Sequence, residues 1–245
     1  MHGTIAGSPV KGLGFLERSG YGRDIARSLR NLFESSAIEM RKEIQKIMPL
    51  ESDEKNGRKI GYDQLDRMMG DSGAKALSEF PNDLGRTGAI QNIFEPLRDM
   101  YDRGGKAWRS QALLVCIDAV GGNSQEHSYL LPVPEFLHAG SLIIDDIQDK
   151  SESRRGKPCT HHVYGEALAI NAGNFSYFVG PVFYRQLPDD KRLKVLDLFF
   201  STMMSAHVGQ GADIAGLSSI MPEVVATGNS ELATGAIIGI HRLKR

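Results

Sequence analysis

Apolar residues recur every three or four positions along most of this chain, the spacing of one face of an α-helix. A first helix is predicted over residues 22–48 and a weaker one over 62–79. From about residue 87 onward nearly all of the sequence carries this period, in segments near 87–102, 106–120, 133–151, 163–186, 189–209 and 230–243. Strand-like alternation of useful length is missing. The pattern therefore predicts an all-α protein, a helical bundle with short connections.

Glycine, proline and polar clusters interrupt the helical pattern at a few places. Residues 1–20 are rich in glycine and have no period, which indicates a loose leader. Pro49 and the polar run 51–58 mark a linker or a mobile loop. Pro96 would kink the helix predicted over 87–102 unless it lies near a helix start, because proline lacks the N–H that a helix interior needs.

The composition narrows the class of protein. Hydrophobic residues make up 41% of the 245 residues and charged residues 24%, as in ordinary globular proteins. The net charge of −1 argues against a nucleic-acid partner. Two cysteines are too few for a disulfide framework, and neither a secretory signal nor a transmembrane segment is visible. We therefore expect a cytoplasmic location.

The most informative stretch is EFLHAGSLIIDDIQDKSESRRGKPCTHHVY, residues 135–164. Asp145 and Asp149 are four residues apart, so their carboxylates share one helix face at about 6 Å. Clustered carboxylates of this kind suit Mg²⁺, which commonly binds one or two carboxylates together with substrate phosphates. Arg154 and Arg155 follow closely. Guanidinium groups beside a carboxylate–metal site indicate a bound polyphosphate.

Further cationic groups predict a second anion site. His138 lies seven residues before the first aspartate, on nearly the same helix face and roughly 10 Å away. Upstream, in GGKAWR, Lys106 and Arg109 are three residues apart at a predicted helix start, which itself favours anions. One site would use the metal and Arg154, and the other Lys106, Arg109, His138 and Arg155. Each feature alone is more often an ordinary surface or core feature, but their combination favours function.

With these motifs the chain resembles the trans-isoprenyl diphosphate synthases, also called polyprenyl synthetases. GGKAWR is similar to their GGKxxR motif, and LHAGSLIIDDIQDKSESRRG to the first aspartate-rich motif with its arginine pair. HHVYGEALAINAGN and GQGADI, residues 209–214, resemble later segments. The resemblance implies an isoprenoid-synthase-type bundle in a domain over 88–245, preceded by a leader or extension with helical segments over 1–87.

The resemblance also implies the reaction and the residue roles. The expected enzyme is a Mg²⁺-dependent prenyltransferase, a homodimer that condenses isopentenyl diphosphate with an allylic diphosphate. Asp145 and Asp149 would bind Mg²⁺ with Asp146 in support, and Arg154 would contact the allylic diphosphate. The expected ligands of isopentenyl diphosphate are Lys106, Arg109, His138 and Arg155. Gln210 and Lys244 resemble later allylic-site residues, and Asp213 is expected to face the same cavity.

Small residues before the first aspartate imply the product length. Gly140 and Ser141 lie one helical turn before Asp145, where bulky residues in the family stop chain growth early. Small ones would let the growing tail pass, which predicts a product longer than C15, with C20 the expected length.

One departure from the family leaves alternatives open. The sequence has no second aspartate-rich motif. We therefore expect a bundle that is incomplete at its C-terminal end, either as a fragment of an active enzyme or as a catalytically incomplete regulatory subunit. A class I terpene cyclase is a further alternative, although such an enzyme does not need an isopentenyl diphosphate site.

Overall fold

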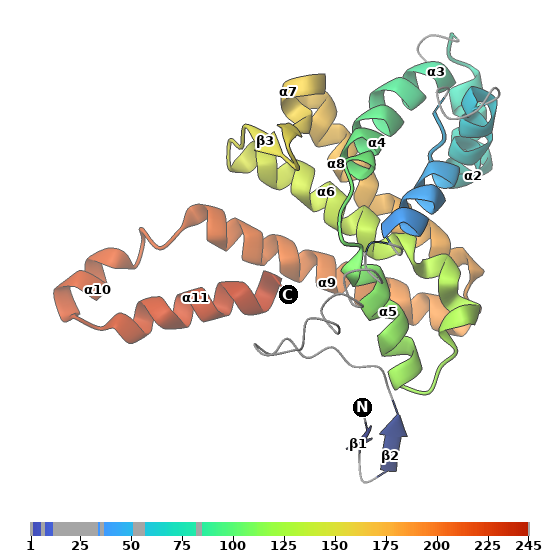
Figure 1. Cartoon of the computed structure of the whole chain (residues 1–245). Coiled ribbons are helices and arrows are strands. Elements are labelled where there is room, and N and C mark those ends of the chain that lie inside the picture. The colour runs from blue at the N-terminus through green and yellow to red at the C-terminus, as the bar shows by residue number, and fades with distance from the viewer. Residues whose placement is uncertain are drawn as a thin grey trace. The chain divides into compact units, whose positions relative to one another are not determined.

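The computed structural model describes residues 2–5, 8–11, 34, 37–50, 57–81 and 85–244. The prediction of an all-α protein is confirmed, because helices account for nearly all of the regular structure in this part of the chain (Figure 1). Contacts divide the chain into two compact units, Met1–Phe183 and Tyr184–Arg245. The proposed domain boundary at residue 88 rests on the family resemblance and stays a prediction.

The first unit holds the helices that carry the predicted motifs. In chain order it contains a helix over 37–47, α2 (Gly57–Ser78), α3 (Arg86–Ala89), the π-helical turn η1 (Ile90–Phe94), α4 (Glu95–Asp102), α5 (Trp108–Ala119), the 3-10 helix η2 (Ser124–Leu130), α6 (Pro132–Gln148), α7 (Thr160–Tyr164) and α8 (Glu166–Val182). The 3-10 helix η3 (Phe183–Gln186) follows at the boundary between the units.

Two short antiparallel hairpins depart from the sequence prediction. The strands β1 (His2–Ile5) and β2 (Ser8–Lys11) pair within the segment predicted to be a loose leader. The strands β3 (Ser153–Arg154) and β4 (Lys157–Pro158) pair directly after the aspartate-rich segment. Arg155 and Gly156 form the turn of this second hairpin with φ values of 53° and 76°, and positive φ at both central residues is typical of a type I′ turn. Strands this short carry no detectable alternation.

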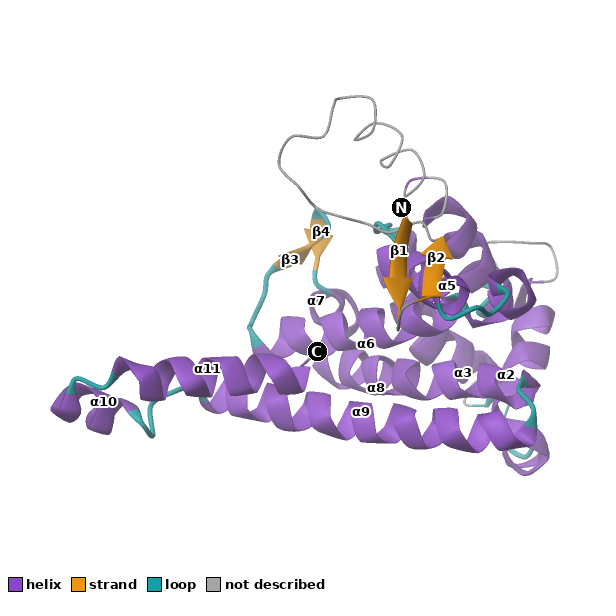
Figure 2. Ribbon diagram, turned by 90° about the horizontal axis from the view of Figure 1, so that it is seen from below, coloured by secondary structure: helices purple, strands orange, loops and turns teal. Residues whose placement is uncertain are grey.

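The core of the first unit centres on α6 and α8, which lie side by side (Figures 1 and 2). Phe136 and Ile143 of α6 are fully buried. The helices approach closely because small residues face each other: a Cβ on Gly140 would lie 2.7 Å from the carbonyl oxygen of Gly173. Ser176 of α8 donates a hydrogen bond of 2.7 Å to the carbonyl oxygen of Phe136.

The close approach of α6 and α8 changes the prediction about the prenyl tail. Gly140 was expected to leave room for a growing chain, but it is buried against the backbone of α8 and fills a packing role instead. Ser141 is only half-buried, and its hydroxyl donates to the carbonyl oxygen of His138 at 2.9 Å. Of the two small residues, only Ser141 remains a candidate for contact with the tail.

The helix over 37–47 packs into the same core, although it precedes the region of family resemblance. Met40 and Ile44 are buried in the cluster that includes Phe136. Just beyond this helix, Met48 offers its carbonyl oxygen to Nη1 of the buried Arg98 at 2.7 Å. The remainder of the helix predicted over 22–48, apart from 34 and 37–48, lies outside the described residues.

The segment predicted as one helix over 87–102 changes from a π-helical turn to an α-helix at Glu95. The π-helical turn η1 comes first, and Pro96 occupies the start of α4. A proline ring would clash with the carbonyl four residues earlier in a regular α-helix. The wider π-turn places that carbonyl elsewhere, and Pro96 lies near a helix start, which is the position where no kink is expected from the sequence.

The second unit consists of α9 (Asp189–Ala215), α10 (Met221–Thr227) and α11 (Ser230–Lys244). The helix α11 returns along α9 (Figures 1 and 2). Gly209 permits this contact, since a Cβ there would lie 2.8 Å from Cβ of Leu243. Compared with the predictions, α9 runs six residues beyond 209, and α10 was not expected.

No helix in the described part of the chain has both the length and the apolar character that crossing a membrane requires.

Candidate active site

The aspartate-rich motif lies at the C-terminal end of α6, as predicted. The backbone N–H of Asp149 donates to the carbonyl oxygen of Asp145 at 2.8 Å, so the helical geometry continues through the end of α6. Asp145 is half-buried and Asp149 is exposed. The two carboxylates therefore share the face expected from their spacing, at the accessible end of the helix.

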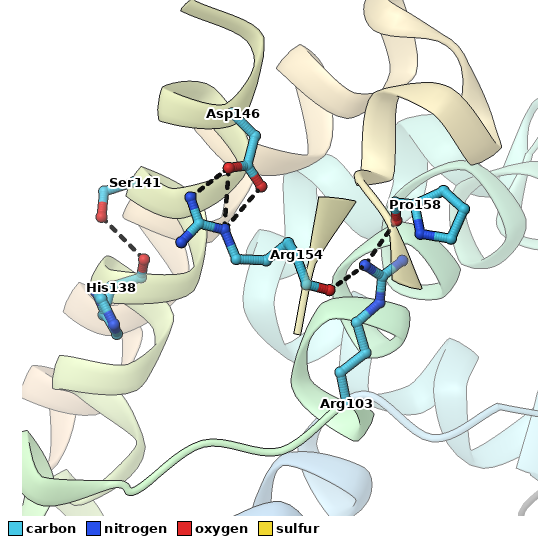
Figure 3. Close-up of polar contacts among 6 residues, drawn as sticks. All are labelled: Arg103, His138, Ser141, Asp146, Arg154 and Pro158. Atoms are coloured by element: carbon cyan, nitrogen blue, oxygen red, sulfur yellow. Dashed lines mark hydrogen bonds and ion pairs between the residues drawn. The ribbon is translucent and has the colours of Figure 1, made fainter. Parts of the chain in front are cut away.

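Asp146, between them, points the other way and is completely buried. Its carboxylate forms an ion pair with Arg154 of β3 (Figure 3), in which Nε donates to Oδ1 at 3.0 Å and to Oδ2 at 3.1 Å, and Nη2 also contacts Oδ1. A buried carboxylate requires such a partner, because burial without one is costly. Asp146 thus positions Arg154, and its expected support of Mg²⁺ binding stays a prediction.

The hairpin that carries Arg154 is held by a residue that the sequence reasoning missed. Arg103, directly after α4, donates from Nη1 to the carbonyl oxygens of Arg154 at 3.2 Å and Pro158 at 2.7 Å (Figure 3). Its Nη2 pairs with Asp99, one helical turn earlier. The spacing of Asp99 and Arg103 signals an ion pair within a helix, but nothing in it indicates the hairpin as a target.

A second feature of the site is a pocket that Arg155 lines and Arg154 does not. Its walls come from the helix over 37–47, the end of α4 with the Gly-Gly segment after it, α6 and the hairpin turn. The lining residues are Ala37, Met40, Arg41, Ile44, Tyr101, Gly104, Gly105, Ala107, Glu135, His138, Ala139 and Arg155. Of the four residues predicted for the second anion site, His138 and Arg155 line it. Arg41 and Glu135 were not predicted.

Arg155 reaches the pocket because the hairpin turn separates it from Arg154. Its Nη1 donates to the carbonyl oxygen of Met100 at 3.2 Å. A Cβ on Gly105 would lie only 3.0 Å from Nη2 of Arg155, so the second glycine of the GGK motif makes room for this guanidinium group. Burial of the guanidinium group lowers the pKa of Arg155. The charge of Glu135 opposes this shift, and nearby arginines add to it.

His138 is uncharged at neutral pH in this setting. Burial lowers its pKa to about 4, and the positive charges of Arg109, Arg155 and Arg154 contribute in the same direction. Burial likewise raises the pKa of Glu135, an effect opposed by Arg109, Arg155 and hydrogen bonding to Ser110. The charge of Arg109 thus acts on both groups, although this residue does not line the pocket.

Lys106 and Arg109 differ from the predicted arrangement at a helix start. The helix α5 begins only at Trp108, and Ala107 before it adopts a left-handed conformation with φ of 47°. Lys106 therefore lies outside the helix and is exposed. Arg109 lies with its guanidinium carbon 4.8 Å from the centre of the Trp108 ring. The two cations do not share a helix face, and their roles toward a substrate stay predictions.

Gln210 and Lys244 belong to the second unit, on α9 and α11. Nζ of Lys244 lies 2.5 Å from Oδ2 of Asp213, and this lysine lowers the pKa of that aspartate. The pair joins the two helices of the unit. The expected contribution of all three residues to an allylic site stays a prediction.

The carboxylates of the aspartate-rich motif fit a Mg²⁺ ion that the substrate helps to bind. No group of three or more His, Cys, Asp or Glu side chains in the described residues is arranged to hold a metal ion. Asp145 and Asp149 alone fit an ion that takes its remaining ligands from substrate phosphates and water, as Mg²⁺ commonly does.

Comparisons with known proteins agree with the motifs. Residues 90–227 match the polyprenyl synthetase family. A geranylgeranyl pyrophosphate synthase of Eremothecium gossypii is 35% identical over 124 residues, which cover 49% of this chain and 39% of that protein. One from Metarhizium anisopliae is 44% identical over 79 residues, or 32% of this chain and 23% of that protein. A copalyl diphosphate synthase of Talaromyces verruculosus is 32% identical over 131 residues, or 54% and 13%.

The fold also has solved counterparts. The geranylgeranyl pyrophosphate synthetase of Pyrococcus horikoshii superposes with a TM-score of 0.56 over 78% of this chain and 48% of that structure, at 24% identity. This likeness supports the isoprenoid-synthase-type bundle. The chain spans about two fifths or less of the length of these curated relatives.

Proposed function

Because this chain belongs to the polyprenyl synthetase family, we propose that it carries the substrate-binding part of a prenyltransferase that joins isopentenyl diphosphate to an allylic diphosphate. One observation carries the proposal. The hairpin over 153–158 directs Arg154 to the aspartate-rich end of α6 and Arg155 to the pocket with His138. Two consecutive arginines thus serve two adjacent anion sites, as a reaction between two diphosphates requires.

The residues at the aspartate-rich end suit the first step, loss of diphosphate from the allylic substrate. Breaking the C–O bond leaves an allylic cation and concentrates negative charge on the departing diphosphate. Arg154, held in place by Asp146, stands ready to stabilise that charge. Asp145 and Asp149 would hold Mg²⁺, which when bound offsets further negative charge on the diphosphate.

The pocket suits the second substrate. Arg155 would bind the diphosphate of isopentenyl diphosphate, and neutral His138 would donate its ring N–H to a phosphate oxygen. Held there, the double bond of isopentenyl diphosphate attacks the allylic cation, and a proton is then lost to the departing diphosphate. No nucleophilic side chain is needed.

A terpene cyclase is the second candidate function, and the similarity to a copalyl diphosphate synthase supports considering it. A cyclase that uses only an allylic diphosphate has no use for an isopentenyl diphosphate pocket. The cluster around Arg155 and His138 therefore favours the prenyltransferase. Several named relatives make geranylgeranyl pyrophosphate, which supports the proposal of a C20 product.

Three further proposals rest on the sequence and the resemblance. The protein is a homodimer and cytoplasmic, and the chain taken alone turns over substrate very slowly, because it lacks a second aspartate-rich motif. A catalytically incomplete subunit that modulates a partner is the alternative. Light scattering tests the dimer, and incorporation of radiolabelled isopentenyl diphosphate tests turnover.

The decisive experiment for the function is calorimetric titration of the chain with isopentenyl diphosphate. We expect saturable binding that Arg155→Gln weakens by about tenfold or more, since a charge-assisted hydrogen bond is lost. The matched control is Lys157→Gln, which removes a charge from an exposed position in the same hairpin. Absence of binding, or equal losses in both variants, would refute the proposed function.

A further inference from the structure

Both glycines of the GGK motif face a guanidinium group. A Cβ on Gly105 would lie 3.0 Å from Nη2 of Arg155, and a Cβ on Gly104 would lie 3.0 Å from Nη2 of Arg41. Gly104 also adopts a φ of 87°, which side-chain-bearing residues rarely do. The pair of glycines therefore opens space for two arginines, which come from segments more than 100 residues apart in sequence.

Three other arginines of this region differ from Arg41 and Arg155, because each of the three is paired with a carboxylate. Arg98, Arg103 and Arg154 each form an ion pair with an aspartate. Arg41 and Arg155 form none with the carboxylates of the described residues. Nε of Arg41 is shielded from solvent and has no hydrogen-bond partner in the same part of the chain. Aspartates hold the three paired arginines in position, whereas Arg41 and Arg155 line a pocket.

The charge of the pocket lining is unbalanced without a ligand. Arg41 and Arg155 contribute two positive charges, Glu135 contributes one negative charge, and His138 is neutral at pH 7. Like charges gathered in one partly desolvated space repel each other. A multiply charged anion in the pocket would relieve this repulsion and could accept a hydrogen bond from the buried Nε of Arg41.

We propose that Arg41 is a further diphosphate-binding residue, whose guanidinium group binds the same isopentenyl diphosphate as Arg155 and His138. This inference rests on the proposed function and deepens it. It assigns a substrate contact to a helix that lies before the family-matched region 90–227. The segment predicted to be an extension would then complete the binding site.

The test compares two ligands of different charge on the full chain. Isopentenyl diphosphate and isopentenyl monophosphate are titrated by calorimetry into the wild type, Arg41→Gln and Lys42→Gln. The control variant removes a charge from the same helix at an exposed position. We expect Arg41→Gln to weaken diphosphate binding about tenfold and monophosphate binding less, so that the ratio of the two affinities falls. Lys42→Gln should leave the ratio unchanged.

A purely structural role for Arg41 predicts another result. Loss of folded protein would lower the apparent binding of both ligands equally, so an unchanged ratio would overturn the inference. Arg41→Lys is the second variant, because it keeps the charge and the packing of the stem but loses the planar fork. An affinity between those of the wild type and Arg41→Gln supports a diphosphate contact. Wild-type affinity in both Arg41 variants overturns it.

Arg155→Gln separates this inference from the function on which it rests. Weaker binding in Arg155→Gln together with unchanged binding in Arg41→Gln refutes only the role of Arg41. No diphosphate binding by the wild type refutes the proposed function itself, and the inference falls with it.

Discussion

The two anion sites proposed for the first unit differ in how their charged residues are held. At the aspartate-rich end, Asp146 and Arg154 are eight residues apart, and the buried carboxylate is fully paired. In the pocket, Arg41, His138 and Arg155 come from distant segments and line open space. The buried Asp146–Arg154 pair contributes to folding, whereas Arg41 and Arg155 line the pocket and form no ion pair with carboxylates of the described residues. Loss of the buried pair should therefore lower stability, and changes to the pocket arginines should mainly weaken ligand binding.

The largest expected effect tests the paired site. Asp146→Ala removes the partner of Arg154 and leaves a cavity at a fully buried position, so we expect a loss of roughly 2–3 kcal/mol in the free energy of unfolding. This figure lies below that of a fully buried pair because Arg154 is partly accessible, with 32% of its side chain exposed. Urea denaturation measures it.

The control for this prediction is Asp149→Ala in the same motif. Asp149 is exposed, so its removal should change the free energy of unfolding by no more than about 0.5 kcal/mol. Equal losses in the two variants would mean that the aspartates do not differ in their structural role.

The second prediction concerns Mg²⁺. If Asp145 and Asp149 hold the ion together with an allylic diphosphate, binding of that diphosphate should strengthen about tenfold or more when Mg²⁺ is added. Asp145→Ala should remove most of this dependence without the destabilisation expected for Asp146→Ala. Titration of the allylic diphosphate with and without Mg²⁺ measures it, and equal binding in both conditions would contradict the assignment.

The third prediction tests the open pocket. Gly105→Ala places a Cβ 3.0 Å from the guanidinium group of Arg155 and must displace it. We expect isopentenyl diphosphate to bind several-fold more weakly, on the scale of one weakened charge-assisted hydrogen bond. The melting temperature should fall little, because the displaced group is the end of a flexible side chain.

Gly122→Ala is a useful comparison for that variant. A Cβ there would meet the backbone of Ile117 at 3.0 Å, far from the pocket lining, so stability should fall without a specific loss of diphosphate affinity. If Gly105→Ala behaves in the same way, Arg155 does not depend on the glycine for its position.

The smallest effect concerns pH. The pKa of His138 is about 4 in the folded protein, below its ordinary value of 6.5. Between these values the unfolded chain binds the proton and the folded protein does not, so stability falls as the pH drops from 6.5 toward 4. Because His138 is only partly buried, we expect a contribution on the order of 1 kcal/mol.

Thermal or urea unfolding at several pH values measures this contribution. His138→Gln should show a shallower loss of stability than the wild type across the same window. Identical slopes in the two proteins would show that the histidine titrates normally and does not lie in the environment described.

The helices and the shared face of the two aspartates could be predicted from the sequence, because both depend on residues that are close together along the chain. Helical periodicity predicted α6, α8 and α9, and the i to i+4 spacing placed Asp145 and Asp149 on one face. Local rules failed where tertiary contacts intervene. Gly140 was interpreted as space for a substrate tail, but α8 occupies that space.

The sequence by itself determined which functional groups are present and in which order. They are a helix that ends in carboxylates, an arginine pair and a Gly-Gly-Lys segment, and their order is typical of one family. Only the tertiary structure decided how these groups are used. A two-residue turn directs Arg154 and Arg155 to different places, and burial of the helix over 37–47 in the core cluster that includes Phe136 brings Arg41 to Gly104. Spacing along a helix is set by backbone geometry within a few residues, whereas convergence of distant segments is set by burial of apolar surface, which sequence periodicity does not encode.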